Sequence, residues 1–162
     1  MPDDFEYVTD DDNAPQLARR PRGKPWVRLL LAGLGVGFLV ILGIAMWLNP
    51  YTADGNARTM ATHTQLGLEP CSFVVITGKP CPACGMTTSF ALLMHGDVSN
   101  SLKANWVGTL FCASLVPLAP WLILGAVRGR LWGVRNLELC STMALSALLV
   151  LMMIRWAVLM LT

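Results

Sequence analysis

The sequence predicts an all-α integral membrane protein with three transmembrane helices and a cysteine-containing extracytoplasmic connection. Two observations predict this fold class. Hydrophobic residues make up 54% of the chain and charged residues only 14%, whereas soluble domains are about one quarter charged. In addition, three apolar runs are each long enough to cross a hydrocarbon core of about 30 Å. These runs are residues 29–48, 104–127 and 139–161.

The N-terminal segment, residues 1–25, is rich in charge and lacks apolar periodicity. Such a composition buries too little apolar surface to order a chain, so we expect a disordered cytoplasmic tail. Residues 26–162 then form one membrane domain. The net charge of +2 is too small to predict binding to nucleic acid. The expected surroundings are therefore the lipid bilayer, with another membrane protein as a candidate partner.

Each predicted span has one feature that bears on its role. The first, residues 29–48, exceeds the signal-peptide core of about 7 to 15 residues, which favours an uncleaved anchor. The second contains Pro117 and Pro120, which lack backbone donors and predict a kink near its middle. The third contains Arg155 close to its end, and we expect this side chain to snorkel to the membrane interface; the alternative is a buried functional cation.

Basic residues beside the spans predict the orientation, because cytoplasmic segments carry an excess of Lys and Arg. They are Arg19, Arg20, Arg22, Lys24 and Arg28 before the first span, Arg128, Arg130 and Arg135 between the second and third, and only Arg58, Lys79 and Lys103 in the long connection. The N-terminus is therefore expected in the cytoplasm. The connection, residues 49–103, and the C-terminus are expected on the opposite side.

The long connection contains three cysteines, Cys71, Cys81 and Cys84, within fourteen residues. A turn at residues 78–80 precedes the second and third of them. Apolar residues then recur at helical spacing at Met86, Phe90, Leu93 and Met94. This pattern predicts a short amphipathic helix, interfacial or re-entrant, that begins at or just after Cys84 and ends near Gly96.

The cysteines admit several chemistries. Cys81 and Cys84 form a C-x-x-C pair, which can close a disulfide, cycle as a redox pair or hold a metal ion. With Cys71 present, three disulfide pairings are possible, and the sequence does not choose among them. The connection is too short to form a thioredoxin-like sheet and helix. Cys112 and Cys140 fall within the spans and are expected to be packing residues.

A closed zinc site would need a fourth ligand beside the three connection cysteines. His63 is the candidate because its position upstream leaves it free to approach them. His95 is disfavoured as a ligand, because one continuous helix would separate it from Cys84 by roughly 16 Å. The candidate metal ligands are therefore Cys71, Cys81, Cys84 and His63, with zinc as the candidate ion.

Polar residues after the C-x-x-C pair are candidates for supporting it. Asp97 or Ser99 can cap the helix that leads into the second span. Asn105 lies about one turn inside the predicted span and can bond to the cysteine segment or to Thr87 and Thr88. The candidate supporting residues are Thr87, Thr88, Asp97 and Asn105.

The chain resembles a small bacterial membrane-protein family catalogued as domain of unknown function 2752. The resemblance lies in the run C-P-A-C-G-M-T-T at residues 81–88, in Gly96-Asp97 and in Ala104-Asn105, and it covers about residues 71–130. It implies a multi-pass protein of the bacterial inner (cell) membrane. It transfers no catalytic residue, because the family has no assigned activity.

The function expected from these residues is that of a binding or assembly module with a structural disulfide or metal site at its C-P-A-C segment. Enzymatic activity is not favoured. The alternative is a membrane component for thiol-disulfide redox chemistry or metal handling that uses Cys81 and Cys84.

Overall fold

The computed structural model describes residues 7–8, 16–17, 25–129 and 137–161. Two short strands, β1 (Tyr7–Val8) and β2 (Gln16–Leu17), pair in antiparallel register with Tyr7 opposite Leu17. The last residue of the predicted N-terminal tail, Pro25, begins the first long helix, and residues 1–6, 9–15 and 18–24 lie outside the described residues. The disorder of the tail therefore stays a prediction.

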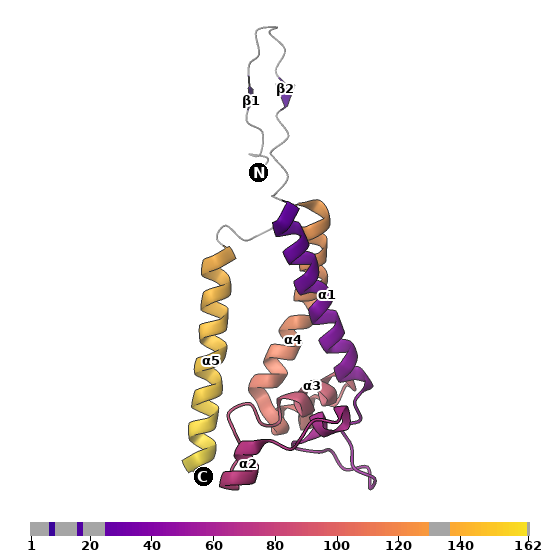
Figure 1. Ribbon diagram of the computed structural model, residues 1–162, viewed down its shortest axis with the longest axis vertical. Helices are drawn as coiled ribbons and strands as arrows, with labels where there is room; N and C mark the ends of the chain where they lie inside the picture. Colours follow the sequence, from indigo (N-terminus) through magenta and orange to yellow (C-terminus); the bar gives the residue numbers. More distant parts are fainter. Residues whose placement is uncertain (1–6, 9–15, 18–24, 130–136, 162) are drawn as a thin grey trace.

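Three long helices are apolar enough to cross a membrane, as the sequence predicted. They are α1 (Pro25–Trp47), α4 (Val98–Arg128) and α5 (Leu137–Leu161). Figure 1 shows the start of α1, the end of α4 and the start of α5 at one end of the molecule. The connection between α1 and α4 lies at the other end, beside the C-terminus of α5. This arrangement is that of a three-span membrane protein.

Helices α1 and α4 pack closely along their length. Gly35 permits this approach, because a Cβ there would lie 2.6 Å from Ile123 Cγ1 and 3.1 Å from the Ala119 carbonyl oxygen. At the end near the N-terminus, Arg28 Nε donates a 2.9 Å hydrogen bond to the Ala126 carbonyl. The buried residues of this interface are Leu31, Leu42, Ala45, Cys112, Leu115, Leu122 and Ala126. The expectation that Cys112 packs in the core is confirmed.

The connection folds into three short helical elements. They are η1 (Thr62–Leu66), α2 (Ser72–Thr77) and α3 (Met86–Met94). The short helix predicted after Cys84 is α3, which ends before Gly96 at φ +82°. Its residues Phe90, Ala91 and Leu92 are buried, so α3 is held within the fold. Asp97 caps α4, since its Oδ1 accepts a hydrogen bond from the Asn100 N–H.

The α4 helix is interrupted at Asn105, where φ is −161° and ψ is 98°. Pro117 and Pro120 lie further along the same helix, and the kink predicted at them stays a prediction. The Asn105 side chain gives a physical reason for the interruption, because its Oδ1 accepts a 3.1 Å hydrogen bond from the Gly108 N–H. In a regular helix that N–H would bond to the Ala104 carbonyl. The side chain therefore replaces the backbone acceptor and releases the Ala104 oxygen.

Helix α5 has no buried residue between 139 and 161. Near its C-terminal end, Arg155 Nη2 donates to the Ala104 carbonyl at 2.9 Å, and Trp156 Nε1 donates to the Pro80 carbonyl at 3.1 Å. Arg155 therefore has a partner in α4, and its snorkelling to the membrane interface stays a prediction. The break in α4 offers it a carbonyl oxygen that has lost its helical partner. Cys140 is exposed, so the expectation that it packs in a core is wrong.

Candidate functional site

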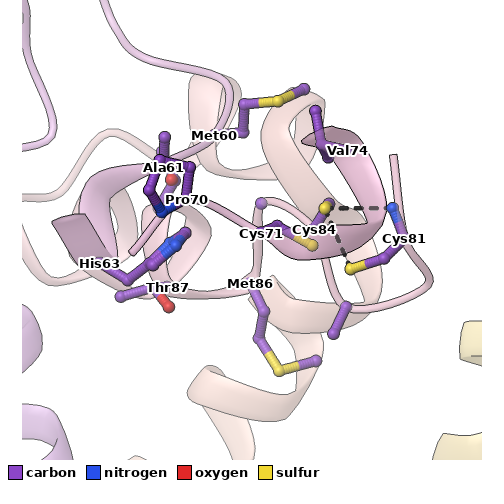
Figure 2. A pocket seen from close by; sticks show the side chains of 13 residues that line it. Met60, Ala61, His63, Pro70, Cys71, Val74, Cys81, Cys84, Met86 and Thr87 are labelled. Carbon is purple, nitrogen blue, oxygen red and sulfur yellow. Dashed lines mark hydrogen bonds between the residues drawn. The ribbon is translucent and has the colours of Figure 1, made fainter. Parts of the chain in front are cut away.

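The structure brings the three connection cysteines together. The Sγ atoms of Cys71, Cys81 and Cys84 all lie within 4.8 Å of one another, and those of Cys81 and Cys84 are 3.0 Å apart. All three residues are half-buried free thiols. Figure 2 shows their side chains converging at one side of a pocket. We call this group the three-thiol cluster.

Local backbone geometry accounts for the pairing of Cys81 with Cys84. The Cys84 N–H donates to the Cys81 carbonyl at 3.1 Å, which closes a tight turn. The Cys81 N–H donates in return to Cys84 Sγ at 3.1 Å. Cys71 reaches the same point from the residue preceding α2, whose first helical residue is Ser72. A turn and a helix start thus place the three thiols.

Gly85 allows the turn to press against α4. Its φ is +81°, in the left-handed region that favours glycine. A Cβ at this position would lie 2.7 Å from the Ala104 carbonyl oxygen and 3.0 Å from the Thr59 carbonyl oxygen. Both obstacles are backbone atoms, which cannot rotate away. A side chain at residue 85 would therefore displace the neighbouring Cys84.

Asn105 connects the three-thiol cluster to the break in α4. The side chain is buried, and its Nδ2 donates to the Cys84 carbonyl at 3.2 Å while its Oδ1 accepts from Gly108. Both ends of the amide are therefore engaged. From the sequence we expected Asn105 to bond either to the cysteine segment or to Thr87 and Thr88. In the structure it bonds to the cysteine segment, at Cys84.

The other candidate supporting residues have different surroundings. Thr88 is buried, and its Oγ1 accepts a 2.8 Å hydrogen bond from Thr62 Oγ1, which ties η1 to α3. Thr87 lines the pocket beside the cluster. The carboxylate of Asp97, at the start of α4, accepts hydrogen bonds from the Asn100 amide and the Tyr51 hydroxyl. Hydrogen bonds from Asn100 lower the pKa of Asp97, and the Asp97 carboxylate caps α4.

A cavity of about 280 Å³ lies beside the three thiols. It is lined by Met60, Ala61, His63, Pro70, Cys71, Val74, Cys81, Ala83, Cys84, Gly85, Met86, Thr87 and Thr88. His63 therefore shares the cavity with the cluster, but among the described residues the group of converging ligand atoms contains only the three thiols. Figure 2 places His63 and Cys81 on opposite sides of the pocket. His95 is engaged elsewhere, through its Nδ1 with the Ala91 carbonyl.

The thiols have unequal electrostatic surroundings. The backbone N–H of Val74, in the first turn of α2, favours the thiolate and lowers the pKa of Cys71. Burial has the opposite effect on Cys84 and raises its pKa to about 12. Arg155 lies close enough to interact electrostatically with Cys84 and Cys81. The sequence marks Arg155 as an isolated charge in an apolar span, which is a signal of function, but it did not place this cation beside the thiols.

These pKa shifts predict the order in which the thiols react in reduced, metal-free protein. Cys71 has the lowered pKa and therefore holds more thiolate at a given pH than Cys84, so it should be alkylated first between pH 7 and about 9. The measurement is iodoacetamide labelling across pH followed by peptide mass spectrometry. Denatured protein, in which the thiols should titrate alike, is the control. Faster labelling of Cys84 would contradict the prediction.

A family described as "Protein of unknown function (DUF2752)" matches residues 71–124. The match begins at the first cysteine of the cluster and extends through most of α4, so it contains all three thiols and Asn105. It confirms the resemblance predicted from the C-P-A-C motif. No curated protein and no solved structure matches the chain.

Proposed function

We propose, for a membrane protein whose residues 71–124 match the DUF2752 family, that its three-thiol cluster binds a thiolate-preferring metal ion, with zinc as the first candidate. One observation carries this proposal. The Sγ atoms of Cys71, Cys81 and Cys84, from two separate segments of the connection, all lie within 4.8 Å of one another. A binding or assembly module stabilised by such an ion fits this geometry.

The spacing of the sulfur atoms suits a single ion. Thiolates bound tetrahedrally at a Zn–S distance of about 2.3 Å are separated by about 3.8 Å. The Cys81 and Cys84 sulfur atoms are 3.0 Å apart, and no pair among the three is separated by more than 4.8 Å. Small side-chain movements therefore suffice for three-point coordination. A fourth position would be filled by His63 after rearrangement, or by water or a small ligand from the cavity.

We further propose that the site faces the extracytoplasmic side of a bacterial cell membrane. The connection and the C-terminus lie at one end of the bundle, opposite the start of α1. Basic residues gather near the start of α1 and the end of α4 and are sparse in the connection. By the positive-inside rule this supports a cytoplasmic N-terminus and an extracytoplasmic site.

Metal analysis of the full chain purified in detergent tests the proposal. After reduction and removal of metal, the protein should take up about one zinc ion per chain. Bound zinc should slow alkylation of the three cysteines of the three-thiol cluster. Protein whose cysteines have been alkylated beforehand is the control and should bind none. Failure of the reduced protein to bind zinc or Cu(I) would overturn the proposal.

A second candidate function is thiol-disulfide exchange, favoured by the 3.0 Å separation of Cys81 and Cys84 Sγ. In this reaction a thiolate of the pair attacks a disulfide of a partner protein and releases one partner thiolate. The second cysteine then attacks the mixed disulfide, so the pair loses two electrons and the partner disulfide becomes two thiols. Reversible oxidation in glutathione buffers, together with no metal uptake, would favour this function over metal binding.

A further inference from the structure

One cation in the described part of the chain, Arg155, combines a fixed position with an unsatisfied donor beside the thiols. Its Nη2 is bound to the Ala104 carbonyl, while its Nη1 is buried without a hydrogen-bond partner among the described residues. The guanidinium interacts electrostatically with Cys84 and Cys81. It comes from α5, outside the matched segment of residues 71–124.

The position of the guanidinium is set by the same residues that position Cys84. The Ala104 carbonyl is available to Arg155 because Asn105 Oδ1 takes over the Gly108 N–H. That carbonyl also lies against Gly85, directly after Cys84 in the sequence. Asn105 Nδ2 in turn holds the Cys84 carbonyl. The positive charge and the thiols are therefore fixed to one another through one short stretch of backbone.

Charge counting shows what this cation complements. Three thiolates that bind a zinc ion carry one net negative charge, and three that bind Cu(I) carry two. A guanidinium in a half-buried site stabilises such an anion, because opposite charges attract more strongly where water is scarce. A disulfide with one remaining thiol has no net charge and leaves Arg155 without compensation. The cation thus fits an anionic metal-thiolate complex better than a disulfide.

We propose that Arg155 is the charge-compensating residue of the three-thiol cluster, so that the third helix completes a metal site whose ligands all lie in the connection. This inference rests on the proposed metal-binding function. It adds that the bound state is anionic. The stabilisation by Arg155 should grow with that negative charge and should be larger for Cu(I) than for zinc.

The test compares variants that separate charge from helix attachment. Arg155→Gln and Arg155→Met remove the charge with side chains of different shape, and Arg155→Lys retains it. Trp156→Phe is the matched control, because it removes the hydrogen bond to Pro80 and leaves the charge. Zinc and Cu(I) affinities of the full chain in detergent are measured by chelator competition, with circular dichroism to verify folding.

The neutral variants should bind zinc about 10-fold more weakly than the wild type, within the range for partners just outside the ligands. Their loss of Cu(I) affinity should be larger still. Arg155→Lys and Trp156→Phe should stay within about threefold of the wild type. Equal losses in the neutral variants and in Trp156→Phe would assign Arg155 a structural role and overturn the inference, as would unchanged affinity. Absence of metal binding by the wild type would instead overturn the proposed function itself.

Discussion

Replacement of Cys84 by serine is expected to weaken zinc binding by at least about 100-fold, equivalent to about 2.7 kcal/mol. Cys84 Sγ is 3.0 Å from Cys81 Sγ and belongs to the three-thiol cluster. A serine hydroxyl is not ionised near neutral pH and is a poor zinc ligand, so only two thiolates would remain. Zinc affinity by chelator competition, measured on reduced protein in detergent, checks this result. Cys71→Ser and Cys81→Ser should give losses of similar size.

The matched control is Cys140→Ser, which changes the same atoms at an exposed position of α5 outside the cluster. Its zinc affinity should equal that of the wild type. A second control, the thermal unfolding midpoint without metal, identifies any variant that loses affinity because it is misfolded. Metal affinity that survives in Cys84→Ser would show that zinc binds elsewhere and would contradict the proposed site.

Replacement of Gly85 by alanine is expected to destabilise the protein more than the replacement of any other connection glycine by alanine. The new Cβ would meet two backbone oxygens, at 2.7 Å and 3.0 Å, and residue 85 would keep a φ of +81°. The left-handed conformation alone costs about 1 to 2 kcal/mol for a non-glycine residue. The backbone contacts should add about 1 to 3 kcal/mol of overpacking. Thermal unfolding in detergent is the measurement.

Gly67→Ala separates the two costs. Gly67 has a similar φ of +76°, but a Cβ there meets nothing within 4 Å. It should therefore show only the conformational penalty and unfold at a clearly higher temperature than Gly85→Ala. Equal unfolding temperatures for the two variants would mean that the turn before α3 relaxes freely. In that case Gly85 would not hold Cys84 against α4.

Features that depend on a few neighbouring residues were predictable from the sequence. The three spans follow from composition and length, and the structure confirms them within a few residues at most ends. Gly96 and Asp97 predicted the boundary between α3 and α4, because helix caps depend on local backbone geometry. The three cysteines were recognised as one candidate site from their spacing, although the sequence could not show that their sulfur atoms converge.

Features that depend on contacts between distant segments were not predictable. The break in α4 at Asn105 was not predicted, because the Asn105 amide bonds to Cys84 in another segment. The contact of Arg155 with the Ala104 carbonyl was not predicted, because this acceptor is released only by the break in α4. The pairing of Thr62 with Thr88 across 26 residues likewise has no sequence signature.

The Ala104 oxygen also has a consequence for how the chain is assembled during its synthesis. The residues of α4, including its interruption, are translated before Arg155. Until then a peptide oxygen near the membrane lacks its helical partner, which is costly wherever water is excluded. When α5 packs beside α4, Arg155 donates a hydrogen bond to that oxygen. In the metal site that we propose, charge compensation of the thiols therefore requires the final span.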